Sequence, residues 1–199
     1  MTVNDMKNSN KKCRSLFKST LNTRALPTGN LRYIRSDFPD RLTDDEVKWL
    51  IKNDIIFIID LREEKEYRKK HCRLEDEENF YYLHMPVTGG DIVPSSPEAV
   101  AKSYLAMLDT QMDKIIDTLL TAKHNVLFFC GAGKDRTGVV SAVLLKKLGY
   151  DDKTIIDDYM KTKENLQDYL KSYVKEHPEV DIHTIMPNEC NIKAILKVI

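Results

Sequence analysis

Short apolar runs alternate with amphipathic stretches along most of this chain. The runs at 55–59 and 125–129 are continuous and rich in β-branched and aromatic residues, and residues 80–87 form a further apolar stretch. Continuous runs of this kind are typical of strands that are buried on both faces. Buried strands that alternate with helices indicate a parallel sheet. We therefore predict an α/β fold, with a central mostly parallel sheet flanked by helices on both faces.

The helices between these strands carry recognisable start and stop signals. Thr43 and Glu46 have the spacing of a capping box, and Ser96 followed by Pro97 is typical of a helix start. Gly149 follows a stretch that is apolar nearly all round, which predicts a buried central helix ending there. The predicted helices run from 43, from 97 to about 122, over 139–148, and over about 152–160 and 162–174.

Length and composition are those of one domain. The 199 residues can bury a substantial core, and we expect residues 1–20 to form a flexible tail and 21–199 to form a single domain. Lys plus Arg and Asp plus Glu number 31 each. This balance argues against a general nucleic-acid or membrane-surface binder. No stretch approaches the roughly 18 apolar residues that a membrane-spanning helix needs.

The cysteines indicate a reducing compartment. The four of them show no Cys-x-x-Cys pair and no disulfide-framework spacing, and the first twelve residues lack the apolar core of a signal peptide. We therefore expect a cytoplasmic protein, although a mature secreted form would have the same pattern. The five histidines share no metal-ligand spacing with cysteine or carboxylate, so no metal is expected.

One segment carries most of the chemistry. Residues 128–138 read Phe-Phe-Cys-Gly-Ala-Gly-Lys-Asp-Arg-Thr-Gly, between the strand at 125–129 and the central helix. Ionised sulfur is a strong nucleophile, and a helix N-terminus and a nearby cation both favour the ionised form. Backbone N–H groups at such a junction bind anions, and Arg binds phosphate oxygens in pairs. The segment therefore predicts a site that holds a phosphate dianion and attacks it with Cys130.

Cys-x5-Arg followed by Thr resembles the phosphate-binding loop of the cysteine-dependent protein tyrosine phosphatase superfamily. The continuation at 132–138 resembles its bacterial tyrosine/serine branch, which has dual or triple specificity and tolerates phosphoinositides. Segments 22–24, 31–36 and 58–62 resemble other elements of that branch, so the likeness spans roughly 20–165. The resemblance implies a phosphotyrosine-phosphatase-like fold, a single phosphatase domain over 21–199, and no cofactor.

The resemblance also implies roles for the loop residues. Cys130 would form a phosphocysteine intermediate, and Arg136 would grip the equatorial oxygens of the phosphoryl group. Thr137 would donate its hydroxyl to the sulfur. The amides expected to cradle the phosphate belong to Gly131, Ala132, Gly133, Lys134 and Asp135.

The general acid has two candidates. The resembled branch uses the Asp within the loop, here Asp135, which we favour. Asp91, flanked by Gly89 and Gly90, is the alternative on a mobile loop, and an ordinary turn residue is the other interpretation of it. Lys134 either adds positive charge beside the pocket or faces solvent. In the resembled branch a Lys here goes with tolerance of phosphoinositides, but phosphoinositide phosphatases carry another basic residue where this chain has Gly131.

Other charged and aromatic positions have a supporting role in this interpretation. Asp60 and Arg62 end a buried strand, where an ion pair that supports the loop is favoured over direct catalysis. Arg24 and Arg35 are interpreted in the same way. Phe129 stands where the family usually has His, so we expect slower turnover than in relatives with His. The charged stretch 62–78 is expected to be a solvated face.

The predicted function is a phosphomonoester hydrolase of the protein tyrosine or dual-specificity type. One alternative is a phosphoinositide or inositol polyphosphate phosphatase that uses the same site, and another is a catalytically weak module that recognises phosphorylated partners. A sulfurtransferase also uses a cysteine loop, but the Arg136–Thr137 pair favours phosphate. The expected partners are a phosphorylated protein or a phosphoinositide substrate, and not a nucleic acid. The sequence does not indicate the oligomeric state.

Overall fold

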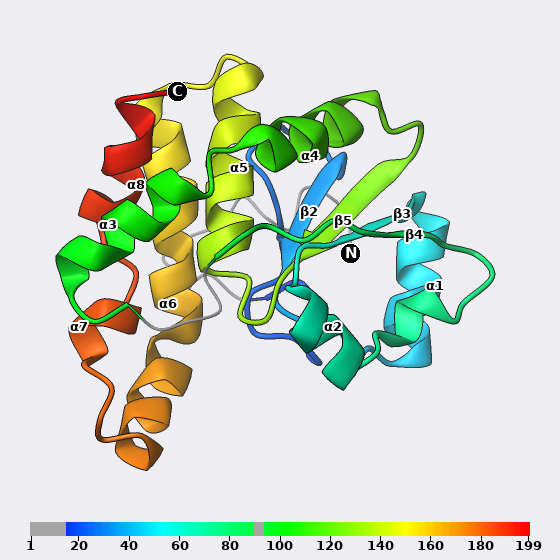
Figure 1. The fold of residues 1–199 in the computed structure, drawn as a ribbon. Coiled ribbons are helices and arrows are strands. Elements are labelled where there is room, and N and C mark those ends of the chain that lie inside the picture. Colours follow the sequence, from blue (N-terminus) through cyan, green and yellow to red (C-terminus); the bar gives the residue numbers. More distant parts are fainter. Residues whose placement is uncertain (1–14, 90–93) are drawn as a thin grey trace.

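The computed structural model describes residues 15–89 and 94–199, and in them one five-stranded sheet forms the centre of the molecule (Figure 1). The strand order is β1-β2-β5-β3-β4. The parallel ladders join β2 to β5, β5 to β3 and β3 to β4, while β1 pairs antiparallel with β2. The strands are β1 (Arg24–Ala25), β2 (Tyr33–Ser36), β3 (Ile55–Asp60), β4 (Tyr81–His84) and β5 (Asn125–Phe129). The predicted α/β fold with a mostly parallel sheet is confirmed.

Helices cover both faces of the sheet. They are α1 (Asp44–Lys52), α2 (Glu64–Lys69), η2 (Arg73–Glu75, a 3₁₀-helix), α3 (Pro97–Ala106), α4 (Thr110–Thr121), α5 (Asp135–Lys147), α6 (Asp152–Glu176), α7 (Ile182–Ile185) and α8 (Glu189–Leu196). Alternate residues of β5 point to opposite sides. Val126 and Phe128 join the larger core with α3, α4, α5, α6 and α8, whereas Leu127 and Phe129 join a smaller core with α1. Within the described ranges, the structure contains no helix that is both long and apolar enough to cross a bilayer.

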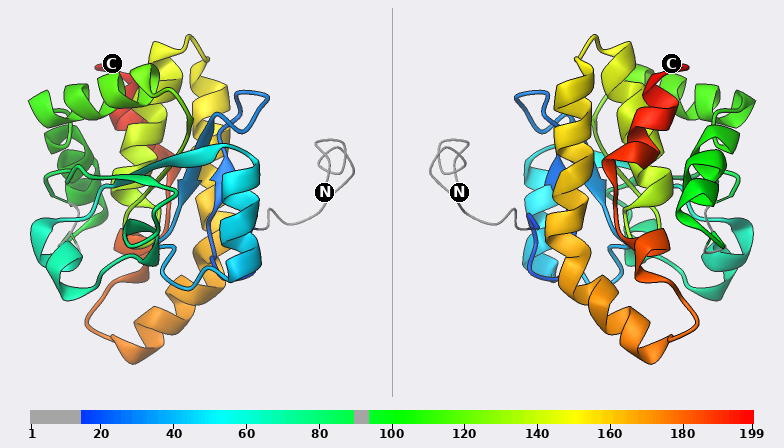
Figure 2. Two further views of the ribbon diagram at one scale, coloured as in Figure 1. Left: turned by 90° about the vertical axis from the view of Figure 1, so that its right-hand side faces the viewer. Right: turned by 90° about the vertical axis from the view of Figure 1, so that its left-hand side faces the viewer.

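Two predicted helix boundaries are wrong. The helix expected from 97 to about 122 is two helices, because Asp109 accepts hydrogen bonds from the backbone N–H groups of Gln111 and Met112, both at 2.9 Å, and starts α4 anew. The two helices expected at 152–160 and 162–174 are one continuous helix, α6. Figure 2 shows α6 running past α5 and extending beyond it. The capping box of Thr43 and Glu46 is confirmed at α1.

One segment expected to be flexible and one expected to be a solvated face are each packed in part. The expected tail extends to residue 20, and its first fourteen residues lie outside the described part of the chain. Phe17 is buried in the smaller core, and the Leu16 amide donates to the Thr23 carbonyl at 2.7 Å. In the charged stretch 62–78, Cys72 and Leu74 are fully buried in the same core. Both segments pack because burial of their apolar side chains in the smaller core is favourable, although their neighbours in the sequence are charged or polar.

Candidate active site

The segment 130–136, called here the Cys130 loop, joins the end of β5 to the start of α5. Gly133 has a φ of +63°, and a Cβ atom there would lie 2.5 Å from the Ser36 carbonyl oxygen at the end of β2. A side chain at 133 would therefore have to displace backbone. A Cβ at Gly131 would meet nothing closer than 3.6 Å, so sterics do not require that glycine.

Hydrogen bonds to neighbouring residues turn the loop carbonyls away from the centre of the loop. The Gly131 carbonyl accepts from the Phe38 amide at 2.9 Å. The Gly133 carbonyl accepts from Asn22 Nδ2 and from Arg35 Nη2, each at 2.9 Å. Because C=O and N–H point in opposite directions across a trans peptide, the N–H groups of these two peptides face away from those partners. The loop thereby presents N–H groups on one side, as an anion-binding cradle requires.

A buried ion cluster holds the groups that turn these carbonyls. Asp158, on α6, accepts from Arg24 Nε at 3.1 Å and from Arg35 Nη1 at 2.7 Å. Arg24 Nη1 also donates to Asn22 Oδ1 at 2.6 Å. Burial raises the pKa of Asp158, but the charges of Arg24 and Arg35 outweigh it and lower the pKa to about 2. The expected supporting role of the two arginines is confirmed in these contacts, and their partner Asp158 is new.

Asp60 and Arg62 also form the expected ion pair. Arg62 Nε lies 2.9 and 3.0 Å from the two Asp60 oxygens, and Arg62 Nη2 lies 2.6 Å from Oδ2. The guanidinium stacks over the Phe38 ring at 3.9 Å, and the Phe38 amide holds the Gly131 carbonyl. Arg62 Nη1 donates to the Lys70 carbonyl at the end of α2. The pair thus joins the loop to α2.

Phe129 is a core residue here. Its side chain is fully buried and its ring lies 5.8 Å from the Phe38 ring and 6.5 Å from the Tyr82 ring. Its carbonyl accepts from the Leu61 amide at 2.8 Å, which ties the end of β5 to the end of β3. An apolar residue at the position before the cysteine therefore supports the loop by packing against the neighbouring aromatic rings.

Cys130 and Arg136 stand at the two ends of the loop, and both are nearly buried. Arg136 forms a two-pronged ion pair with Glu66 of α2, through Nη1 to Oε2 and through Nη2 to Oε1, the latter at 2.9 Å. Burial lowers the pKa of Arg136, but the hydrogen bonds that it donates to Glu66, together with the nearby Cys130, outweigh burial and raise the pKa. Burial raises the pKa of Glu66, and Arg136 more than reverses this, so the net pKa is lowered.

Glu66 is a site residue that the sequence analysis missed. The charged stretch 62–78 is expected to be a solvated face, and for Glu66 this expectation is wrong, because its carboxylate pairs with Arg136 and also accepts from the Glu63 amide at 3.0 Å. The only local signal is the capping box of Glu63 and Glu66. A second signal is positional: α2 begins shortly after β3, and the carboxyl ends of parallel strands lie at one edge of a sheet.

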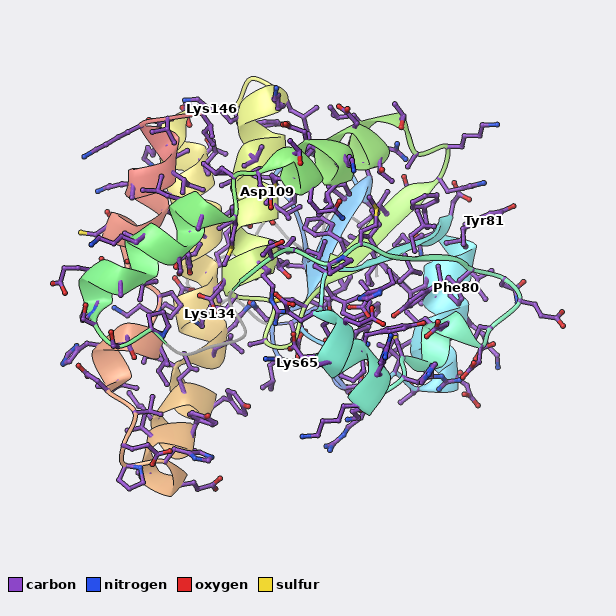
Figure 3. The ribbon with its side chains drawn as sticks, viewed as in Figure 1. Lys65, Phe80, Tyr81, Asp109, Lys134 and Lys146 are labelled. Carbon is purple, nitrogen blue, oxygen red and sulfur yellow. The ribbon has the colours of Figure 1, made fainter. Side chains whose placement is uncertain are left out.

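Asp135 lies at the first position of α5 and accepts two hydrogen bonds on one oxygen. Lys134 Nζ donates to Oδ1 at 2.7 Å, and the Tyr104 hydroxyl donates to the same atom at 2.6 Å. The Lys134 side chain is 10% exposed, so the solvent-facing interpretation of it is wrong. Figure 3 labels Lys134 at the start of α5 and Lys65 on α2.

The remaining predicted site residues have different outcomes. The Thr137 hydroxyl is buried without a hydrogen-bond partner in this structure, so the expected bond to the Cys130 sulfur is not formed. Arg136 Nε is likewise buried and without a partner. Ala132 packs against the small apolar cluster of α6 and α7. Asp91 lies outside the described residues.

Cys72, Cys130 and Cys190 are free thiols, and Cys13 lies outside the described residues. Burial raises the pKa of Cys72 to about 12, which makes it unreactive. Within 15–89 and 94–199, no three His, Cys, Asp or Glu side chains gather as a metal site would require.

Comparison with known proteins gives the family. The model of the tyrosine phosphatase family matches residues 19–198. A tyrosine-protein phosphatase of Nostoc commune is 26% identical over 137 residues, which are 64% of this chain and 47% of that protein. The triple specificity protein phosphatase PtpB of Mycobacterium tuberculosis is 45% identical over 49 residues, 25% of this chain and 18% of that protein. The matches thus span less than half the length of these relatives.

Among solved structures, kinase associated phosphatase with its catalytic cysteine replaced by serine is 15% identical. The likeness covers 80% of this chain and 97% of that one, with a TM-score of 0.48. The family model, in contrast, covers nearly the whole chain. The chain belongs to the tyrosine phosphatase family.

Proposed function

We propose that this chain is a phosphomonoester hydrolase that acts on phosphotyrosine-like substrates through a phosphocysteine intermediate. The observation that carries the proposal is the geometry of the Cys130 loop. Its carbonyls are tied outward by Phe38, Asn22 and Arg35, so its amides are free to receive an anion between Cys130 and Arg136. Arg136 Nε is buried and unpartnered, and a phosphoryl oxygen would supply its acceptor.

The reaction has two steps. In the first, the Cys130 sulfur attacks phosphorus and the bond from phosphorus to the ester oxygen breaks, with its electron pair staying on that oxygen. Asp135 gives the departing oxygen a proton. In the second step the Asp135 carboxylate takes a proton from water, the water oxygen bonds to phosphorus, and the thiolate leaves. Arg136 and the loop amides hold the equatorial oxygens throughout.

The substrate is a phosphorylated protein or a phosphoinositide, with phosphotyrosine favoured. Lys134 supports tolerance of a further anionic group because its nearly buried ammonium lies beside the loop. Free thiols at Cys72, Cys130 and Cys190 support a reducing, cytoplasmic location.

A substrate panel tests the proposal. Purified protein is assayed on phosphotyrosine, phosphoserine and phosphothreonine peptides, phosphoinositides and inositol phosphates, with Cys130→Ser as the blank. We expect phosphate release from phosphotyrosine peptides by the wild type alone, and a phosphoenzyme that can be trapped on Cys130 by rapid denaturation. Binding of phosphopeptides without any release would favour the recognition module instead, and release by Cys130→Ser would contradict the mechanism.

The general acid is tested separately. The pH–rate profiles of Asp135→Asn and Asp91→Asn are compared with that of the wild type. We expect Asp135→Asn to lose the basic limb, since that limb reports the acid in its protonated form. Loss of the limb in Asp91→Asn alone would assign the role to Asp91.

A further inference from the structure

Tyr104, on α3, is a buried group that the reaction steps above do not use. Its side chain is 1% exposed, and its hydroxyl donates to Asp135 Oδ1 at 2.6 Å. Lys134 Nζ donates to the same oxygen at 2.7 Å. With both donors on Oδ1, the carboxyl group is fixed in orientation and Oδ2 is the oxygen suited to carry an exchangeable proton.

The hydroxyl chain continues behind Tyr104. Its oxygen lies 2.9 Å from the hydroxyl of Tyr159, on α6. Because the Tyr104 proton is directed to Asp135, Tyr159 donates in this second bond. The chain of donors therefore runs from Tyr159 on α6 through Tyr104 on α3 to Asp135 at the start of α5.

Both phenols remain donors across the neutral range. Burial, and then the charge of Asp135, raise the pKa of Tyr104 well above its usual value. Burial likewise raises the pKa of Tyr159. The charged groups near this chain of hydrogen bonds include Lys134, Asp135, Arg136 and Arg35, and Arg35 is paired with Asp158, the residue before Tyr159.

We propose that Tyr104 is a positioning residue for proton transfer by Asp135, holding Oδ1 so that Oδ2 gives its proton to the leaving oxygen and later takes one from water. This inference rests on the proposed function. A donor to a carboxylate stabilises its ionised form. Loss of the Tyr104 hydroxyl therefore removes one of the two donors that stabilise the carboxylate, and it also lets the carboxyl group rotate.

The test is Tyr104→Phe, which removes the hydroxyl and keeps the ring. kcat and KM are measured against pH with phenyl phosphate and with p-nitrophenyl phosphate. Phenolate is the more basic leaving group and depends more on a general acid. We expect kcat for phenyl phosphate to fall roughly tenfold, with less loss for p-nitrophenyl phosphate, little change in KM and a basic limb moved to higher pH.

Tyr33→Phe is the matched control, because Tyr33 is buried in the same core on β2 and lies outside the proposed chain. It is expected to keep the wild-type profile. Replacement of Tyr104 by 3-fluorotyrosine preserves the packing and makes the phenol a stronger donor, so the basic limb should move to lower pH. This second variant also carries the test if Tyr104→Phe does not fold.

The outcomes separate the two proposals. A wild-type protein that hydrolyses neither ester would overturn the proposed function itself. An active wild type with an unchanged basic limb in both Tyr104 variants, and equal loss on the two substrates, would overturn the role of Tyr104 while leaving the phosphatase in place.

Discussion

At the scale of single residues, Glu66 sets the orientation of the Arg136 guanidinium toward the Cys130 loop. Both Nη atoms of Arg136 are engaged by the Glu66 carboxylate, while Nε is buried and open to another acceptor. An arginine held in this way has a fixed plane, which a phosphoryl group needs for paired contacts. The carboxylate also places negative charge near the anion site, so its benefit lies in orientation.

We expect Glu66→Gln to lower kcat/KM for p-nitrophenyl phosphate by about 10- to 100-fold, because the guanidinium loses its charged partner and its orientation. Glu64→Gln is the control: Glu64 lies on the same helix and forms an exposed pair with Arg68. The test is the kcat/KM of both variants, measured by steady-state kinetics with p-nitrophenyl phosphate. Equal activity of the two would mean that Glu66 does not orient Arg136.

The Cys130 loop was predictable because its chemistry is local. Cys130, Gly133 and Arg136 follow one another within seven residues, and the strand before them and the helix after them are both strongly apolar. Glu66 and Tyr104 reach the loop from elements far away in the chain. No pattern in their own segments indicates where their side chains point, so only the folded arrangement reveals them.

At the scale of elements, the strands that could be predicted are those with a local apolar pattern, and the strands that were missed depend on distant residues. β3 and β5 are continuous apolar runs, and their hydrophobic pattern alone predicts a buried strand. β1 and β2 carry Arg24 and Arg35 at buried positions and lack such a run. Their charges are buried only because Asp158 of α6 pairs with them, more than 120 residues further along the chain.

The break between α3 and α4 depends on one side chain. Asp109, labelled in Figure 3, caps α4 through the amides of Gln111 and Met112. We expect Asp109→Ala to lower the free energy of unfolding by about 1 kcal/mol, since two N–H groups lose their acceptor. Asp117→Ala, at an exposed position of the same helix, should leave it nearly unchanged. If urea titrations gave the same free energy of unfolding for the two variants, Asp109 would have no capping role.

At the scale of the whole molecule, Asp158 connects the α6 layer to the edge of the sheet that supports the loop. It is fully buried, pairs with Arg24 and Arg35, and through them fixes Asn22 and the Gly133 carbonyl. Removal of one partner from a buried cluster leaves charge uncompensated, so Asp158→Asn should cost about 3–5 kcal/mol of stability. Asp157→Asn, next in the chain with an exposed partner in Lys153, should change little.

The pH dependence of this loss has a definite sign. The pKa of Asp158 falls from 3.8 to about 2 on folding, despite burial, because of the two arginines. A carboxyl group with a depressed pKa contributes stability above its unfolded pKa and loses it as pH falls through the folded value. The ionised form therefore contributes about 2 kcal/mol above roughly pH 4, and this is lost toward about pH 2.

Unfolding free energies of the wild type and Asp158→Asn, measured by urea titration from neutral pH down to the acid limit of the folded state, test this sign. The difference between them should be constant above about pH 4 and should narrow below it, since only the wild type has this carboxylate to protonate. The pH dependence of unfolding in Asp157→Asn is the reference for the loss of one acidic group at an exposed position. A difference that stayed constant into acid would mean that Arg24 and Arg35 do not hold Asp158 ionised.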